Sequence, residues 1–294
     1  MRVLVTGGAG RLGRSVVDGL ADAGHEVVSV DVTAAPLEKA ADTFPADLTD
    51  LGQAYGVMAR YRPDAVVHLA AIAVPFSRPE SVIHATNTAL AYNVLQAAVD
   101  LGVGTVVTAS SPTVMGYGSP AGWAPQYLPL DEAHPPRPWN AYGLSKLAAE
   151  QTMRMFAAQH GDRVRLAAFR PCFVIAPEEW AGAPTQQGHT VRERIADPRY
   201  GGVTLFNYVD ARDCADFLDT LLGKAGEVPN GEVYFVGAQD ALADAPLAEL
   251  LPEFSGVAPE LAAGLTGTSP AFSSAKAERL LGWTASRSWR TELR

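Results

Sequence analysis

The sequence predicts an α/β protein, with a doubly wound parallel sheet covered by helices on both faces and a small C-terminal α/β lobe. Short apolar runs alternate along the chain with segments whose apolar residues recur at helical spacing. A glycine-rich turn joins the first apolar run to the first helical segment. The first run, this helix and the second run fit within about thirty residues, the length of one parallel βαβ unit. Repetition of such units indicates a parallel sheet with helices on both faces.

The predicted elements follow one another in chain order. Residues 3–5 form the first strand, and the helix after it has apolar residues every three or four positions from Leu12 to Leu20. Further strands are expected at residues 26–30, 65–69, 105–109 and 164–169, and long helices at residues 81–101 and 141–160. Two irregular stretches interrupt the alternation, residues 116–138 and residues 177–203. Irregular segments of this length inside a compact domain are often lids or binding loops.

Composition argues against several classes of protein. With 294 residues, 48% of them hydrophobic, the chain can bury the core of one large domain with a small lobe. A formal net charge of −9 argues against a nucleic-acid partner, which needs clustered basic side chains. No apolar run approaches the roughly 20 residues of a membrane span, and the start MRVLVTGG is unlike a signal peptide. Two cysteines suit neither a disulfide framework nor a zinc site. We therefore expect a cytoplasmic protein with no metal and no membrane partner.

The glycine-rich turn TGGAGRLG places Gly7, Gly10 and Gly13 between a strand and a helix. Glycines let the backbone approach a pyrophosphate closely, and the free N–H groups of the helix N-terminus stabilise its charge. A glycine-rich turn that binds no ligand can have the same spacing. Asp31, at the end of the second strand, lies where a carboxylate accepts hydrogen bonds from the adenosine ribose of a dinucleotide. Because this carboxylate repels a ribose phosphate, we expect NAD rather than NADP.

Tyr142 and Lys146 stand four residues apart on one face of a predicted helix, in the segment NAYGLSK. A tyrosine has an ordinary pKa of about 10, and a neighbouring ammonium lowers this pKa because it stabilises the phenolate. Tyr142 can then act as a general acid or base. Ser110 and Ser111 follow an apolar strand, at the sheet edge where open α/β folds bind ligands, so Ser111 can hydrogen-bond a reacting oxygen. The Tyr-Lys spacing alone also occurs on helices without a catalytic function.

Five motifs occur in a fixed order: TGGAGRLG, HLAA at residues 68–71, Ser110-Ser111, YGLSK and Arg170-Pro171. Together they resemble the extended short-chain dehydrogenase/reductase family, of the NAD-dependent epimerase/dehydratase type. The resemblance implies a Rossmann-type NAD-binding domain over residues 1–170, with parts of residues 203–237. It implies a substrate lobe formed mainly by residues 171–294.

The resemblance also assigns site residues by position in this sequence. The expected catalytic group is Ser111, Tyr142 and Lys146. The expected cofactor-binding residues are Gly7, Gly10, Arg11, Leu12, Gly13, Asp31, Asp47, Leu48, Leu69, Ala70, Ala71, Asn87, Tyr142, Lys146 and Pro171. The expected substrate-binding residues are Ser110, Ser111, Thr113 and Phe173. Relatives also imply a homodimer through the helices at residues 81–101 and 141–160.

The resemblance leaves the net reaction open. One hydride step gives net oxidation or reduction, and return of the hydride to the same substrate gives epimerisation. Nucleotide-sugar epimerases of this family usually carry an arginine two residues before Tyr208 that binds the diphosphate, and Phe206 stands at that position here. We therefore expect an NAD-dependent oxidoreductase acting on a small sugar or sugar acid. A nucleotide-sugar epimerase is the first alternative, and a cofactor-binding regulator without turnover is the second.

The catalytic region is most similar to uronate dehydrogenases within this family, in the segments SSPTVMGYG, LDEAHPPRP and YGLSK. Pro112-Thr113 replaces the Asn-His pair that those enzymes carry after the serines. Their carboxylate-binding arginine has three candidate counterparts here, Arg192, Arg194 and Arg199. The sequence identifies neither the sugar nor the carbon that is oxidised.

Overall fold

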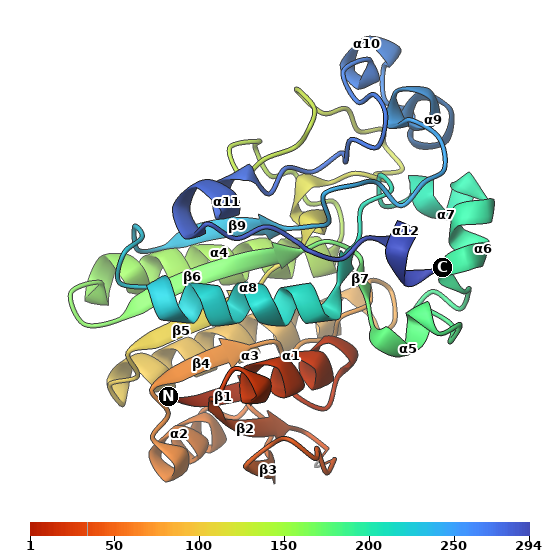
Figure 1. Ribbon diagram of the computed structural model, residues 1–294. Coiled ribbons are helices and arrows are strands. Elements are labelled where there is room, and N and C mark those ends of the chain that lie inside the picture. Colours follow the sequence, from red (N-terminus) through yellow and green to blue (C-terminus); the bar gives the residue numbers. More distant parts are fainter. Residues whose placement is uncertain (34) are drawn as a thin grey trace.

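Seven parallel strands form the central sheet of the computed structural model, which describes residues 1–33 and 35–294 (Figure 1). Their order across the sheet is β3-β2-β1-β4-β5-β6-β9. The strands are β1 (Arg2–Thr6), β2 (Glu26–Asp31), β3 (Asp42–Pro45), β4 (Ala65–His68), β5 (Thr105–Ala109), β6 (Arg165–Pro171) and β9 (Glu232–Val236). The first six positions match the 3-2-1-4-5-6 order of dinucleotide-binding Rossmann folds, whose ligands bind where the order reverses. The predicted fold class is confirmed.

Long helices cover both faces of this sheet (Figure 1). They are α1 (Arg11–Asp22), α2 (Leu51–Tyr61), α3 (Glu80–Asp100), α4 (Ala141–His160) and α8 (Ala211–Lys224). Alternate residues of β1 serve the two layers, as the two-residue repeat of a strand requires. Val3 and Val5 face α1 and α8, whereas Leu4 faces α2, α3 and α4.

The remaining elements are short and lie mostly at the carboxyl ends of the strands or after α8. They are the 3₁₀ helix η1 (Pro112–Met115), the paired strands β7 (Val174–Ile175) and β8 (Val209–Asp210), and the helices α5 (Pro177–Trp180), α6 (Val191–Ala196), α7 (Pro198–Gly202), α9 (Leu247–Ser255), α10 (Pro259–Ala262), α11 (Ala275–Leu281) and α12 (Trp289–Glu292). In Figure 1, α5, α6, α7 and α12 lie together at one end of the sheet.

The stretch of residues 177–203 differs from the expected irregular loop, because it contains the three short helices α5, α6 and α7. Helix α6 begins with a capping box, in which Thr190 accepts from Glu193 N and Glu193 accepts from Thr190 N. Helix α7 begins at Pro198, after the N-cap Asp197, whose carboxylate accepts from Arg199 N. These local caps let short helices form where no long apolar repeat exists.

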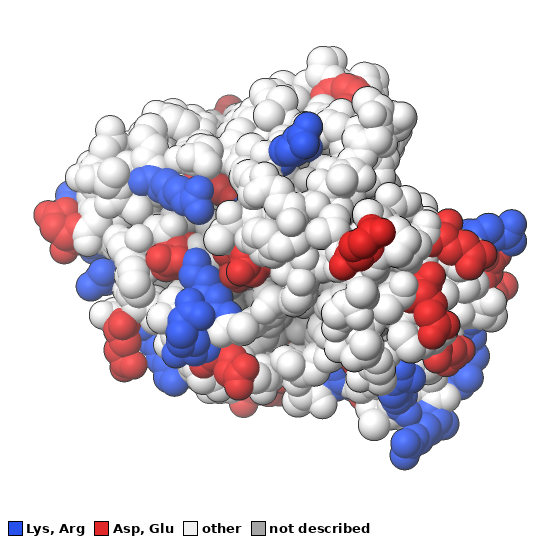
Figure 2. Space-filling model, turned by 90° about the horizontal axis from the view of Figure 1, so that it is seen from above, with Lys and Arg blue, Asp and Glu red and all other residues white. Residues whose placement is uncertain are grey.

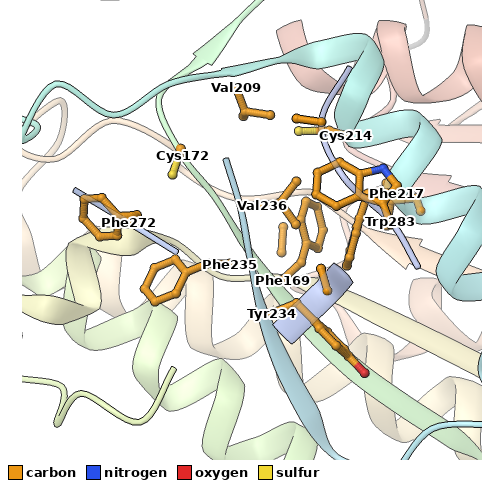
Figure 3. Packing of buried hydrophobic residues seen from close by; sticks show 14 of the residues in the cluster. Phe169, Cys172, Val209, Cys214, Phe217, Tyr234, Phe235, Val236, Phe272 and Trp283 are labelled. Atoms are coloured by element: carbon orange, nitrogen blue, oxygen red, sulfur yellow. The ribbon is translucent and has the colours of Figure 1, made fainter. Parts of the chain in front are cut away.

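Aromatic side chains join β9 to α8 and to the C-terminal segments (Figure 3). The ring centroid of Phe217 lies 5.8 Å from that of Tyr234 and 5.2 Å from that of Trp283. Cys172 and Cys214 are free thiols buried in the same cluster. The segment after α8 is thus packed into the main core, because its aromatic residues share one apolar layer with the sheet.

The surface carries charges of both signs. On the face shown in Figure 2, basic and acidic side chains are interspersed among uncharged residues. Within the described part of the chain, none of the helices has the length and apolar character needed to cross a membrane.

Candidate active site

A cavity of about 920 Å³ opens at the carboxyl ends of β1, β2, β4, β5 and β6. It lies at the edge of the sheet where parallel α/β folds bind their ligands. Every expected site residue lines this cavity except Asn87. The structure therefore brings together residues that are up to 166 positions apart in the sequence, from Gly7 to Phe173.

The glycine turn forms the floor of one end of the cavity. Gly7 has a φ of +71°, and a Cβ built on it would lie 2.7 Å from the backbone nitrogen of Ala70. A Cβ on Gly13 would lie 2.1 Å from the carbonyl oxygen of Gly7. Helix α1 starts after Gly10 with no side-chain cap and no acidic residue in its first turn. Its first N–H groups therefore remain available to an anion, which is what a pyrophosphate requires.

Acidic and amide side chains shape the same end of the cavity. The Asp31 carboxylate accepts a hydrogen bond from Ala9 N at 3.2 Å, which holds it beside the glycine turn. Hydrogen bonds from Thr49 hold the pKa of Asp47 below its ordinary value. Asn93 donates to the carbonyl oxygens of Leu48 at 3.1 Å and Thr49 at 2.8 Å. Sequence reasoning missed Asn93, whose partners lie more than forty residues away.

His68 fixes the loop that follows β4. The hydroxyl of Thr6 accepts from Ala70 N at 3.2 Å and lies 2.7 Å from Nδ1 of His68. The contact between the Thr6 hydroxyl and the His68 ring therefore holds the start of this loop beside the end of β1. Burial lowers the pKa of His68 to about 3, with the Lys146 charge acting in the same direction. His68 is thus a neutral structural anchor for Leu69 and Ala70, which line the cavity.

Tyr142 and Lys146 lie in the first two turns of α4, which is firmly capped. The Asn140 side chain accepts from Gly143 N at 2.8 Å, and Glu80 accepts from Ala141 N at 2.6 Å. Nζ of Lys146 lies 5.7 Å from the ring centroid of Tyr142 and donates to the carbonyl oxygen of Ala109 at 3.0 Å. The predicted helix therefore places both side chains on the cavity side, as their spacing requires.

The pKa of Tyr142 differs from the sequence-based expectation. Burial raises it to about 12, while a hydrogen bond with Ser111 acts in the opposite direction. Burial also lowers the pKa of Lys146 to about 8. The lowering expected from the Lys146 ammonium is therefore wrong for this structure, because desolvation of Tyr142 disfavours the phenolate. Lys146 instead has its ammonium directed at the Ala109 carbonyl.

The two serines after β5 have different surroundings. The Ser110 hydroxyl donates to the Glu150 carboxylate at 2.5 Å. Glu150 also forms a buried bidentate ion pair with Arg170, whose guanidinium donates two hydrogen bonds at 2.7 and 2.8 Å. The Ser111 hydroxyl accepts from the Thr113 hydroxyl at 2.9 Å and interacts with Tyr142. Ser111 is thus the serine that contacts the tyrosine, and Ser110 is bound to the ion pair behind it.

Asn87 lies on α3 and holds a neighbouring loop in place. Its side chain accepts from Ile72 N at 2.8 Å and donates to the Ile72 carbonyl at 3.2 Å. It also donates to the Ser145 hydroxyl on α4 at 3.1 Å. Asn87 therefore connects the loop after β4, which lines the cavity, to the helix that carries Tyr142.

Two ion pairs connect the start of α1 to α5. Arg11 pairs with the buried carboxylate of Glu179, and Arg14 pairs with Glu178 at 2.7 Å. Glu179 also accepts from Ala176 N at 2.7 Å, so its position is fixed. The glycine turn is thereby held against the segment that follows β7.

The other end of the cavity is lined by side chains from several distant segments. They include Tyr117, Phe173, Gln187, Thr204 and Asn207. The three candidate arginines are separated here. Arg192 donates to the Leu293 carbonyl, Arg199 is exposed and paired with Asp197, and Arg194 is buried behind Gln187 and Thr204.

Phe206, at the position where nucleotide-sugar epimerases of this family usually carry an arginine, is buried with a φ of +55°. A Cβ on Gly201 would lie 2.4 Å from the Phe206 ring, so the ring packs against the glycine backbone. Phe206 supplies packing at this position and carries no charge for a diphosphate.

Comparisons with known proteins agree with this geometry. A UDP-glucose 4-epimerase of Azospirillum brasilense is 39% identical over 171 residues, which cover 55% of this chain and 46% of that protein. A UDP-glucose 4-epimerase of Mycolicibacterium smegmatis is 30% identical over 262 residues, which cover 81% of this chain and 77% of that protein. The chain spans about half the length of the first curated relatives that it matches. These relatives support the epimerase alternative more strongly than the expected dehydrogenase.

A solved structure with the same fold comes from Agrobacterium tumefaciens. It is a short-chain dehydrogenase/reductase superfamily protein with bound NAD, and it matches with a TM-score of 0.75 at 24% identity, over 100% of this chain and 95% of that chain. A family model described as "NAD dependent epimerase/dehydratase family" matches residues 3–237. NAD dependence of this family agrees with the cofactor expected from Asp31. The chain therefore belongs to the NAD dependent epimerase/dehydratase family.

Proposed function

We propose that this protein is an NAD-dependent sugar epimerase, which oxidises a hydroxyl carbon of its substrate and returns the hydride to that carbon. The observation that carries the proposal is the meeting of Ser111, Tyr142 and Lys146 with the glycine turn in one cavity. The sequence relatives described above, which are epimerases, favour return of the hydride over its net transfer.

The residues at the glycine end fit a dinucleotide. Uncapped N–H groups of α1 suit a pyrophosphate, and a Cβ at Gly7 or Gly13 would fill the space that the backbone needs. Asp31 would accept from the adenosine ribose hydroxyls, and Asp47 and Leu48 would lie beside the adenine. Ala70, Ala71 and Pro171 would line the channel towards the reacting end. When bound, NAD supplies the acceptor for the substrate hydride.

Tyr142 would take the proton of the substrate hydroxyl as the hydride leaves its carbon, and would return this proton when the hydride comes back. Ser111 would hold the reacting oxygen by a hydrogen bond. Lys146, 5.7 Å from the Tyr142 ring, is the side-chain cation that would stabilise the phenolate and bind the nicotinamide ribose. Thr113, Ser110 and Phe173 would border the substrate.

A second proposal is net oxidation of a small sugar or sugar acid. Phe206 favours it, because a buried phenylalanine stands where nucleotide-sugar epimerases of this family usually carry the arginine that binds the diphosphate. The similarity of the catalytic region to uronate dehydrogenases belongs to this second proposal.

One experiment distinguishes the epimerase proposal from the dehydrogenase proposal. Purified protein is mixed with NAD and several substrates. UDP-glucose, UDP-galactose, glucose, galactose and glucuronate are incubated separately, and products are identified by NMR while reduced nicotinamide is followed by absorbance. Epimerisation predicts an epimer without accumulation of reduced nicotinamide. Net oxidation predicts equal amounts of reduced nicotinamide and oxidised product. Turnover that is unchanged in Tyr142→Phe would overturn both mechanisms.

We also propose that two copies of the chain form a homodimer, and that different parts of the chain hold the cofactor and the substrate. The outer faces of α3 and α4 expose Val82, Tyr92, Leu144 and Met155, which a second copy would cover. Residues 1–170, with parts of 203–237, would hold NAD, and residues 171–294 would mainly hold the substrate. Light scattering should give the dimer mass, and Leu144→Glu should shift it to the monomer.

A further inference from the structure

Two aromatic side chains meet at the mouth of the cavity. Phe76, in the loop after β4, is 59% exposed, and Trp139, just before α4, is 37% exposed. Both line the cavity, and their ring centroids lie 5.6 Å apart with the ring planes tilted by 35°. Neighbouring apolar side chains that remain exposed beside a cavity often mark a ligand-binding site. Neither ring takes part in the proposed mechanism.

Hydrogen bonds hold the two rings in place. Nε1 of Trp139 donates to the carbonyl oxygen of Tyr117 at 3.0 Å, and Tyr117 lines the substrate end of the cavity. Glu80, a few residues after Phe76, accepts from Ala141 N at 2.6 Å, just after Trp139. The loop after β4 and the segment before α4 are therefore joined beside the rings, and the aromatic pair belongs to the substrate end.

The backbone at Phe76 is strained. Its φ is +61°, in the left-handed region that bulky residues rarely adopt. The loop around it is fixed, because Asn87 binds the N–H and the carbonyl oxygen of Ile72 and the Ser77 hydroxyl donates to the Val74 carbonyl at 2.7 Å. The chain thus keeps an unfavourable conformation that leaves a phenylalanine ring exposed at the cavity mouth. A ligand that covers this ring would account for the cost.

The lining around the aromatic pair is uncharged. Val74 and Val203 are exposed apolar residues that line the cavity, and Gln186 and Gln187 add neutral amides that suit sugar hydroxyls. In the described part of the chain, the charged lining residues belong to the cofactor end or to its junction with the substrate end, and they are Arg11, Asp31, Asp47 and Lys146. This mouth therefore suits a neutral ligand with an apolar surface.

Two nearby residues agree with a neutral mouth. Arg194 is not a lining residue, because it lies behind Gln187 and Thr204, which accept from its guanidinium at 2.6 and 2.5 Å. Phe206 is buried at the position where nucleotide-sugar epimerases of this family usually carry an arginine. Among the lining residues that the structure describes, a diphosphate at this mouth would meet no cation, whereas an aromatic ring would meet two rings.

We propose that the substrate is an uncharged sugar derivative that carries an aromatic ring, such as a phenyl group, and that this ring binds against Phe76 and Trp139. Aromatic rings prefer offset or edge-to-face contacts, which a tilted pair offers. The reacting sugar lies deeper, beside Tyr142. The proposal rests on the proposed function in taking this cavity as the sugar site, and it adds the substrate class. UDP-glucose would still bring a sugar to Tyr142, but its diphosphate would lie among neutral groups.

Calorimetric titrations of the protein loaded with NAD test this proposal. The probes are phenyl β-glucoside and methyl β-glucoside, which differ only in the ring, and UDP-glucose, whose ring is attached through a diphosphate. Phe76→Leu and Trp139→Leu each remove one aromatic ring and keep an apolar side chain. Tyr127→Leu is the matched control, because Tyr127 is also an exposed aromatic residue but does not line the cavity.

We expect the wild type to bind phenyl β-glucoside on the order of tenfold more tightly than methyl β-glucoside, because the phenyl ring leaves water. Phe76→Leu and Trp139→Leu should each weaken phenyl β-glucoside binding about 3- to 10-fold, through loss of an aromatic contact. Their affinity for methyl β-glucoside and for NAD should stay near that of the wild type. Tyr127→Leu should bind all probes as the wild type does, and UDP-glucose should bind more weakly than phenyl β-glucoside.

The proposal is overturned if the wild type binds phenyl β-glucoside no better than methyl β-glucoside, or if UDP-glucose binds more tightly than both. It is also overturned if the leucine variants lose both glucosides to the same degree, since purely structural rings would do this. Should Trp139→Leu fail to fold, Phe76→Leu decides, because its side chain is largely exposed. Binding of phenyl β-glucoside that depends on the rings, without turnover of any sugar, would refute the proposed function alone. Epimerisation with no preference for the phenyl ring would refute this inference alone.

Discussion

The two ends of the cavity are built in different ways. The cofactor end consists mainly of backbone, because a glycine turn, the start of α1 and the ends of β1, β2 and β4 form its walls. The substrate end consists of side chains from residues as far apart as Tyr117 and Asn207. Backbone geometry at the first end follows from short sequence motifs. The second end depends on tertiary packing, and a local pattern does not reveal it.

Tyr142 lies where the cofactor end and the substrate end of the cavity meet. Its substitution tests whether the reaction takes place at this junction. Tyr142→Phe should lower kcat about 1,000-fold, because general acid–base catalysis contributes 10²–10⁴-fold, while NAD affinity changes little. Steady-state kinetics and NAD titration measure both quantities. Tyr127→Phe, which removes a hydroxyl outside the cavity lining, is the control and should keep wild-type kcat. Equal effects of the two substitutions would show that the junction is not the reaction centre.

Lys146 tests the cost of placing a cation at that junction. Its pKa is lowered from the ordinary 10.5 to about 8, so its burial favours the neutral form. Deprotonation of Lys146 in the folded protein therefore adds to the free energy of unfolding as the pH rises. This added stability is complete above pH 10.5 and is lost as the pH falls through 8. Lys146→Met should therefore raise the free energy of unfolding at neutral pH by up to about 3 kcal/mol, while activity falls sharply.

Chemical denaturation at several pH values measures this effect. The wild type should gain stability between pH 8 and 10.5 relative to Lys146→Met. Lys39→Met, at an exposed lysine paired with Asp22, is the control and should show no such difference. If the free energy of unfolding changed with pH in the same way in the wild type and in Lys146→Met, the cost assigned to burying the Lys146 charge would be contradicted.

Gly13 tests the claim that the cofactor end is made of backbone. In Gly13→Ala the new Cβ would lie 2.1 Å from the Gly7 carbonyl oxygen, so α1 must move away from the turn. We expect a loss of about 1–3 kcal/mol of stability and weaker NAD binding. Gly56→Ala is the matched control, because a Cβ there meets nothing within 4 Å inside α2. Gly56→Ala should stabilise the protein by about 0.5–1 kcal/mol. Equal changes in thermal stability of Gly13→Ala and Gly56→Ala would contradict the close packing assigned to the glycine turn.

Asp31 tests cofactor choice at the same end. Asp31→Ser removes the carboxylate that repels a ribose phosphate, so the ratio of NADP to NAD affinity should rise about tenfold. Fluorescence titration with both cofactors measures this ratio. Asp22→Ser, at an exposed aspartate near the end of α1, should leave it unchanged. If the ratio of NADP to NAD affinity is unchanged in Asp31→Ser, then Asp31 does not determine which cofactor binds.

The same contrast explains what the sequence predicted. The parallel sheet and the helices α1, α3 and α4 follow from apolar repeats and the glycine turn, and their predicted positions are confirmed to within one or two residues. β3 was missed because it is a four-residue edge strand, DTFP, with no apolar repeat. The short helices α5, α6 and α7 were missed because caps rather than a long apolar face define them.

Several residues that do not line the cavity carry weaker sequence signals. Leu205 and Phe206 have φ values of +53° and +55°, which bulky residues rarely adopt, and no local pattern announces this conformation. Arg194 was one of three candidate arginines, and only its burial distinguishes it from Arg192 and Arg199. Glu150 had no motif of its own, because its partners are Ser110, which follows β5, and Arg170 of β6.

The central claim is that both ends of the cavity serve one reversible hydride transfer at the sugar carbon. The most direct measurement follows UDP-glucose labelled with deuterium at C4, incubated with the protein and NAD, by NMR and by nicotinamide absorbance. The account predicts an epimer that keeps the deuterium at C4, with no accumulation of labelled reduced nicotinamide. An epimer that has exchanged its label with solvent would contradict the account.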